Sequence, residues 1–313
     1  MSPFLLSIAA IGVLVYVVTK TVIPADSAPQ SASYLNYRRT MRRRLKVAFI
    51  IPIVAMAASL LYGMITVAID SEQPPDIKVL RVALGALWWP GLFLLPLIAM
   101  IITERTTRPS GPRIATLAPR GIRTLLPRWI LIAVGTVGTL AALSPIVLLS
   151  PIGRSRILLS ANNPPHQRYS IDATDLWISY TTFITAAVLA AALIHATTRR
   201  PDIDPLTGSD SWSRSGTAVR ALCLLYIPAT GVIADVAAIV KNASLDYVDH
   251  LRAHGDTIVG LGWLRSGTVP YIAEGFAALL YLGVIVALVA FARPPAPRAL
   301  AAPAPRNDPT PAA

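Results

Sequence analysis

The chain has 313 residues, of which 54% are hydrophobic and only 14% charged, and its mean hydropathy is +0.57. Soluble domains carry roughly 25% charged residues, so this composition argues against a water-soluble globular protein. The formal net charge of +12 would suit nucleic acid, but the positions of the basic residues favour a membrane role and predict no nucleic-acid partner.

Seven apolar stretches, each about as long as a membrane-crossing helix, run through the chain from end to end. They cover residues 3–19, 46–69, 80–102, 129–150, 177–197, 218–241 and 270–291. A helix of about 20 residues crosses the hydrocarbon core, where the backbone has to satisfy its own hydrogen bonds. The sequence therefore predicts an all-α transmembrane bundle of seven helices.

The stretch 3–19 is the shortest of the seven, and the alternative for it is a cleaved secretory signal. Such a signal begins with basic residues, whereas here the first basic side chain, Lys20, follows the apolar run. We therefore expect residues 3–19 to be retained as a membrane span.

Lysine and arginine are distributed unevenly between the connections. Alternate connections carry 20 of them on one side and 8 on the other. Because basic residues concentrate on the cytoplasmic side, this distribution predicts an N-terminus outside and a C-terminus in the cytoplasm. Residues 1–292 would then form one seven-span membrane domain, and residues 293–313, rich in proline and alanine, a disordered cytoplasmic tail.

A basic cluster directly precedes the second stretch. It consists of Arg38, Arg39, Arg42, Arg43, Arg44 and Lys46. Anionic lipid headgroups attract basic residues beside a membrane by about 1 kcal/mol each. We interpret the cluster as a lipid-facing anchor at the cytoplasmic face, with specific lipid or protein binding as the alternative.

Asp235 is the only acidic residue well inside an apolar stretch, where an ionisable group normally faces protein or water. Helical spacing places it on one face with Pro228 and Gly231. Glu274 begins the last stretch in the same leaflet, so the two acids form a candidate proton or cation transport site. The alternatives are a structural acid at Asp235, for example paired with Lys241, and an ordinary interfacial residue at Glu274.

The third stretch contains Trp88-Trp89-Pro90-Gly91 and, further on, Pro96. Prolines remove backbone donors and bend helices. The pattern predicts a kinked or locally opened segment that could move during transport, although such kinks also occur in inert bundles.

The segment from Asp246 to His254 holds the best metal-like cluster. If it is helical, Asp246, His250 and His254 fall four residues apart on one face. Imidazole and carboxylate at this spacing can hold Zn²⁺, but the spacing is weakly specific. The favoured interpretation is an outer loop that forms an amphipathic helix on the membrane surface, with metal binding as the alternative.

Motifs that carry catalysis or bind cofactors are missing from the sequence. It has no His-Glu-x-x-His, Gly-x-Ser-x-Gly or P-loop pattern. Its one cysteine, Cys223, cannot form an internal disulfide and suits a small packing residue. We therefore expect no enzymatic activity and no cofactor.

One connection has a recognisable sequence, which runs from Arg108 to Arg120 as Arg-Pro-Ser-Gly-Pro-Arg-Ile-Ala-Thr-Leu-Ala-Pro-Arg. It resembles loops in uncharacterised multi-pass membrane proteins of high-GC Gram-positive bacteria. The excess of 24 arginines over 4 lysines suits such a source. The resemblance covers this one loop and implies a bacterial plasma membrane location without implying an activity.

Together these patterns predict an integral plasma-membrane protein that is not an enzyme and acts through membrane-protein partners as an accessory or scaffold subunit. The alternative is a small transporter or permease component that uses Asp235 as its coupling residue.

Overall fold

The computed structural model describes residues 32–69, 75–106, 126–149, 174–200, 209–254 and 269–292, together with residues 203 and 294. These segments form six helices, α2 (Ala32–Ile69), α3 (Pro75–Thr106), α5 (Arg128–Leu149), α7 (Thr174–Arg199), α8 (Ser209–His254) and α10 (Val269–Ala292). The described residues contain no strand, so the all-α prediction is confirmed for them. The predicted span 3–19 and, apart from Pro294, the tail 293–313 lie outside the described residues.

Three segments in the described part of the chain are long and apolar enough to cross a membrane. They are Arg128–Ile146, Leu176–Arg199 and Ser213–Ile239, and a shorter apolar segment covers Ala278–Ala292. Large apolar side chains also lie exposed on the outside of the helices, among them Ile50, Val54, Ile132, Ile146, Val188, Leu279 and Ile285. Exposed apolar surface on this scale is typical of contact with lipid, so both features are consistent with a membrane protein.

Several helices are longer than the apolar stretches that predicted them. Helix α2 begins at Ala32, so the basic cluster is helical, and α8 continues as far as His254. The helix expected at Asp246–His254 is present, but it is not a separate element within an outer loop, because these residues extend α8 without a break. Polar residues can continue a helix that apolar packing has already nucleated, since each further residue adds a backbone hydrogen bond.

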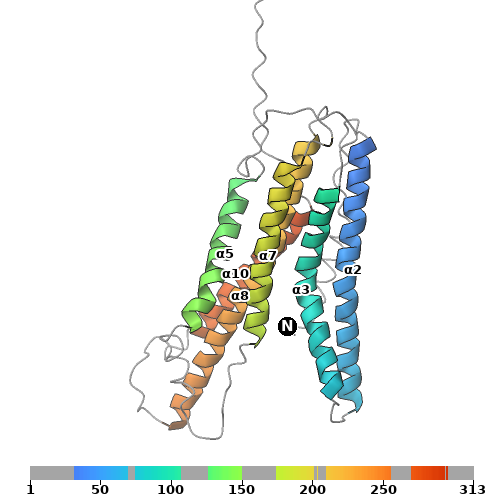
Figure 1. Ribbon diagram of the computed structural model, residues 1–313. Coiled ribbons are helices and arrows are strands. Elements are labelled where there is room, and N and C mark those ends of the chain that lie inside the picture. Colours follow the sequence, from blue (N-terminus) through green and yellow to red (C-terminus); the bar gives the residue numbers. More distant parts are fainter. Residues whose placement is uncertain are drawn as a thin grey trace, which may run out of the picture.

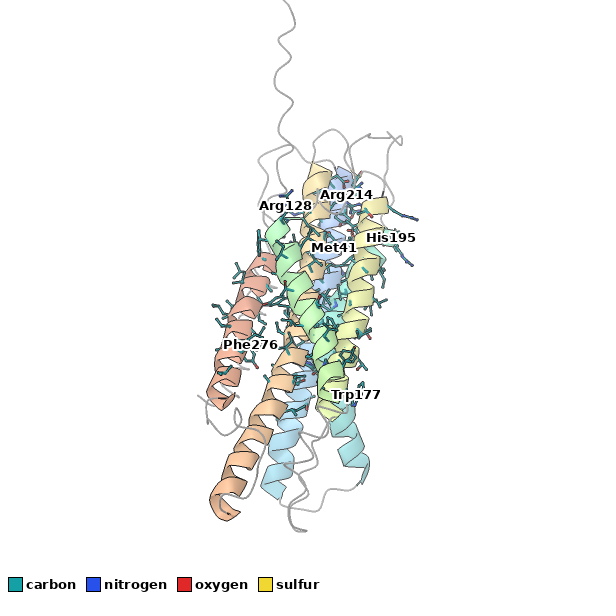
Figure 2. All side chains as sticks on the ribbon, turned by 90° about the vertical axis from the view of Figure 1, so that its left-hand side faces the viewer. Met41, Arg128, Trp177, His195, Arg214 and Phe276 are labelled. Atoms are coloured by element: carbon teal, nitrogen blue, oxygen red, sulfur yellow. The ribbon has the colours of Figure 1, made fainter. Side chains whose placement is uncertain are left out.

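Helix α8 lies at the centre of the bundle and contacts α3, α5, α7 and α10, while α2 packs mainly against α3 (Figure 1). The larger hydrophobic core joins all six described helices through residues such as Phe49, Leu97, Ile130, Leu193 and Val219. A smaller core joins α5, α7, α8 and α10 through Ala141, Phe183, Val232 and Leu280. In Figure 2, Arg128, His195 and Arg214 lie toward one end of the bundle and Trp177 toward the other. The end that carries Arg128, His195 and Arg214 is called the Arg200 end below.

Helix α3 is unbroken through Pro90 and Pro96, so the local opening considered for this segment is absent, and a kink there stays a prediction. The helix is closely packed at this point. A Cβ atom at Gly91 would lie 3.2 Å from the Cβ of Pro52 on α2, which shows how closely the two helices approach at this point. On the other side, Trp89 lies edge-to-face against Phe93 and packs beside Gly231 of α8.

Candidate functional site

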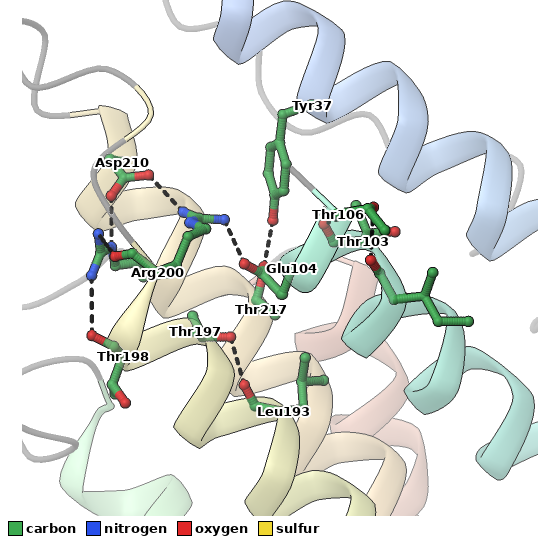
Figure 3. A network of polar contacts seen from close by, with 12 residues as sticks. Tyr37, Thr103, Glu104, Thr106, Leu193, Thr197, Thr198, Arg200, Asp210 and Thr217 are labelled. Carbon is green, nitrogen blue, oxygen red and sulfur yellow. Dashed lines mark hydrogen bonds and ion pairs between the residues drawn. The ribbon is translucent and has the colours of Figure 1, made fainter. Parts of the chain in front are cut away.

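A network of charged side chains joins four helices at the Arg200 end of the bundle (Figure 3). We call Tyr37, Glu104, Arg200, Asp210 and Arg214 the ion network. Arg200 donates one hydrogen bond of 2.7 Å to Oε2 of Glu104 and another of 2.6 Å to Oδ1 of Asp210. Arg214 donates from Nε to Oδ2 of Asp210 at 2.6 Å. Two arginines and two carboxylates thus balance their charges within one connected group.

The secondary structure explains how these side chains meet. Glu104 lies in the last turn of α3, Arg200 directly follows α7, and Asp210 and Arg214 are four residues apart in the first turns of α8. Residues at this helical spacing lie on the same face, so the pairing of Asp210 with Arg214 is local. The pairing of Glu104 with Arg200 depends on α3 and α7 packing side by side.

The ion network is shielded from solvent. The side chains of Arg200 and Glu104 are 1% and 0% exposed. Charges at such sites are costly unless they are paired and hydrogen-bonded. Among the buried side-chain nitrogens and oxygens of the described residues, only Nε of Arg200 and Oγ of Ser144 lack a hydrogen-bond partner. The polar groups of the network are therefore almost all hydrogen-bonded, mostly to one another and in addition to Thr198 and Thr217.

Tyr37 connects α2 to the network. Its hydroxyl donates to Oε1 of Glu104 at 2.6 Å, and the guanidinium carbon of Arg200 lies 4.8 Å from the centre of its ring. Burial raises the pKa of Tyr37 most, and the negative charge of Glu104 raises it further, so that it lies at about 12 compared with the ordinary 10.0. The phenol therefore stays protonated at neutral pH and remains a hydrogen-bond donor to the carboxylate.

Arg200 remains charged in spite of its burial. Burial opposes the charge, but Tyr37, Glu104 and Asp210 outweigh this effect and raise the pKa of the guanidinium above its ordinary value. A guanidinium that stays charged and is held from both sides acts as a fixed bridge between α3 and α8.

Two arginines of α8 bind the C-terminal ends of neighbouring helices. Arg214 donates from Nη2 to the carbonyl of Arg200 at 2.7 Å, just beyond the end of α7. Arg220 donates from Nε to the carbonyl of Phe291 at 3.1 Å, in the last turn of α10. The last carbonyls of a helix lack partners within it, and a cation there also opposes the negative end of the helix dipole. Helix α8 thus holds the ends of α7 and α10.

The structure divides the basic cluster of α2 into two groups. Arg39, Arg42, Arg43 and Lys46 are exposed, whereas Arg38 and Arg44 are half-buried. Arg44 turns toward α3 and donates to the hydroxyl of Thr106 at 2.8 Å and to that of Thr103 at 3.3 Å. Four of the six residues are therefore open to the surroundings, and Arg44 links two helices.

The predicted transport residues are only partly described. Asp235 is half-buried on α8, within the candidate span Ser213–Ile239. On the face it was expected to share, Pro228 is buried and Gly231 half-buried. The side chain of Glu274 lies outside the described residues, so the pairing of the two acids stays a prediction.

The predicted metal cluster also lies in a part where only the backbone is described. Asp246, His250 and His254 belong to the last turns of α8, as the spacing requires, but their side chains lie outside the described residues. Within the described side chains, no group of three or more His, Cys, Asp or Glu residues could hold a metal ion.

The ion network was missed by the sequence reasoning because arginines in the connections were counted only as topology signals. Arg200, Arg214 and Arg220 belong to that count but are buried at their helix ends. Two signals were available in the sequence. Glu104 is an acid beside a basic loop, and Asp210 precedes Arg214 at a spacing typical of helical ion pairs.

No protein-family model, curated protein or solved structure matches the chain.

Proposed function

We propose that this protein is a multi-pass integral protein of the bacterial plasma membrane that acts through membrane-protein partners as a non-enzymatic accessory or scaffold subunit. In this proposal the seven spans place the N-terminus outside, and the Arg200 end faces the cytoplasm. The observation that carries the proposal is the distribution of polarity. Large apolar side chains are exposed along α2, α5, α7 and α10, while the ion network is enclosed at one end.

The chemistry of the ion network favours a structural role over a catalytic one. Both carboxylates are bound by arginines, and Tyr37 donates its proton toward Glu104. Groups that neutralise one another in a closed network hold helices in a defined arrangement, which a scaffold needs. A general base, in contrast, has to reach a substrate proton.

Topology is tested with reporter fusions in a bacterial host. Alkaline phosphatase, which is active only outside, is fused to the N-terminus, and a fluorescent protein that folds in the cytoplasm is fused after residue 292. Activity of both reporters, with the protein retained in alkali-washed membranes, supports the proposal. Both ends on the same side, or release into the aqueous fraction, would contradict it.

A transport function is the second candidate, favoured by a half-buried Asp235 within a membrane-capable segment of the central helix. Its test is proton or cation flux in proteoliposomes for the Asp235→Asn variant. Thr181→Val is the matched control, since the Thr181 hydroxyl is exposed and bonds only within α7. If the protein is an accessory subunit, we expect no flux from the unaltered protein or from Asp235→Asn. We also expect its membrane complex to persist in Asp235→Asn. Flux that only Asp235→Asn abolishes would establish transport and contradict the scaffold proposal.

A further inference from the structure

The exposed basic residues of α2 form a single face of the helix. Arg39, Arg42, Arg43 and Lys46 are spaced by three or four residues, which places them side by side along α2. The opposite side of the helix is buried and includes Tyr34, Tyr37, Met41 and Phe49. These four cations, which we call the basic face, therefore point away from the bundle.

The basic face continues directly into an apolar one. Val47, Ile50, Ile51 and Val54 are exposed on the following turns of the same side of α2. Cations at the membrane surface followed by aliphatic side chains match the two parts of a phospholipid, its charged headgroup and its acyl chains. A soluble anion would need only the first part.

The basic face has no acidic neighbour on its own helix. Helix α2 contains no acidic residue, and the ion pairs found between Glu104, Arg200, Asp210 and Arg214 among the described residues do not include the basic face. Like charges four residues apart repel one another on a helix. A bound anion would relieve this repulsion.

We propose that the basic face of α2 binds a phospholipid whose headgroup carries two phosphates, with its acyl chains along Val47, Ile50, Ile51 and Val54. The four cations extend over eight residues, or about 10 Å of helix rise, which exceeds what one phosphate can span. One arginine can donate two hydrogen bonds to two oxygens of the same phosphate. Arg39, Arg42 and Arg43 therefore supply the main contacts, and Lys46 supplies a further charge. This inference rests on the proposed membrane function, because the apolar face has to lie in lipid.

The test uses the full-length protein purified in mild detergent, with lipid retention followed by native mass spectrometry. The lipids are cardiolipin, phosphatidylglycerol and phosphatidylcholine, which carry two, one and no net negative charges. We expect cardiolipin to be retained at least about tenfold better than phosphatidylglycerol at equal phosphate, and phosphatidylcholine to be lost. The variant Arg39→Gln/Arg42→Gln/Arg43→Gln/Lys46→Gln should abolish this preference.

The matched control is Arg105→Gln/Arg128→Gln/Arg199→Gln, which removes three exposed arginines from α3, α5 and α7. The control should retain cardiolipin like the unaltered protein. If the fourfold variant is not inserted, the single variants Arg42→Gln and Lys46→Gln should each weaken retention. Equal retention by the fourfold variant, or equal retention of phosphatidylglycerol, would overturn the proposal.

Inorganic pyrophosphate distinguishes a soluble anion from a lipid. Competition by pyrophosphate as strong as by cardiolipin at equal phosphate would overturn the lipid assignment. Loss of cardiolipin binding with the reporter topology intact would refute this inference alone, whereas a failed topology would refute the proposed function as well.

Discussion

Glu104 and Asp210 lie on either side of Arg200 and share its charge. Replacing Glu104 by glutamine removes one of these charges and leaves a buried guanidinium with a single anionic partner. Breaking a buried ion pair in this way costs about 3–5 kcal/mol. We therefore expect Glu104→Gln to lower the free energy of unfolding by about 3 kcal/mol, measured as a lower midpoint of thermal unfolding by circular dichroism in detergent.

The neighbouring exposed arginine supplies the control for this prediction. Arg105 follows Glu104 directly but is exposed, so Arg105→Gln should change the free energy of unfolding by no more than about 0.5 kcal/mol. Equal effects of the two substitutions would contradict a stabilising role of the ion network.

Tyr37 gives the network a dependence on alkaline pH. Its pKa of about 12 in the folded protein lies above the ordinary 10.0, so the folded state holds the phenolic proton more tightly. The stability that this difference contributes is complete below pH 10 and is lost as the pH rises through 12. We expect the stability advantage of the unaltered protein over Tyr37→Phe to decrease across this range.

The measurement for Tyr37 combines tyrosinate absorbance with chemical unfolding at each pH. One tyrosine that titrates later than the others, and is missing in Tyr37→Phe, would identify the group. A constant stability difference between the two proteins up to pH 12 would show that Tyr37 does not couple folding to this proton.

The individual residues show where sequence reasoning reaches its limit. Hydropathy was sufficient to place Asp235 within a candidate span, and helical spacing placed Pro228 and Gly231 on its face. The partners of Glu104 were out of reach, because Arg200 is 96 positions away and meets it only through helix packing. Charge counts along the sequence do not distinguish an exposed arginine from one buried in an ion pair.

The helices themselves were easier to predict than their ends. Six of the seven apolar stretches coincide with described helices, because apolar runs of this length favour helix in a membrane. Their ends differ where polar residues extend the helix, as in the first turns of α2 and the last turns of α8. Hydropathy detects the part of a helix that suits lipid and is insensitive to helix that continues into water.

The contact between α2 and α3 depends on Gly91, because glycine has no side chain to hold the two helices apart. A Cβ there would meet the Cβ of Pro52 at 3.2 Å, so a larger residue has to separate the helices. Overpacking of this kind costs about 1–3 kcal/mol, and we expect Gly91→Leu to lower the thermal midpoint accordingly. Gly135→Leu is the control, because a Cβ at Gly135 meets nothing within 4 Å. Destabilisation by Gly135→Leu of the same size would show that tight helix contact is not the cause.

At the scale of the molecule, the arrangement around α8 followed from no sequence pattern. The composition indicated membrane helices, but which helix lies at the centre depends on which faces are small enough to pack. Only half of the Ser213–Ile239 segment is buried, yet this is the highest share among the three membrane-capable segments. Its many small residues, among them Ala218, Ala221 and Ala229, let four neighbours approach.

Cys223 offers a reporter for the integrity of the whole bundle. It is the only cysteine of the chain and is 4% exposed in the larger core. We expect a membrane-permeant maleimide to leave Cys223 unmodified in the native protein and to label it as the bundle unfolds. Labelling should be faster in Glu104→Gln than in the unaltered protein. An Arg199→Cys variant, exposed at the end of α7, should label at once; equally fast labelling at Cys223 would contradict the described core.

The arginines of α8 that bind the ends of α7 and α10 have a mechanical consequence. Sliding α8 along its axis by one turn moves it about 5.4 Å, which is more than a hydrogen bond can stretch. Arg214 and Arg220 would then release both helix ends in the same movement. A piston-like displacement of α8 therefore has to break its contacts with α7 and α10 together, which resists such a movement at this end.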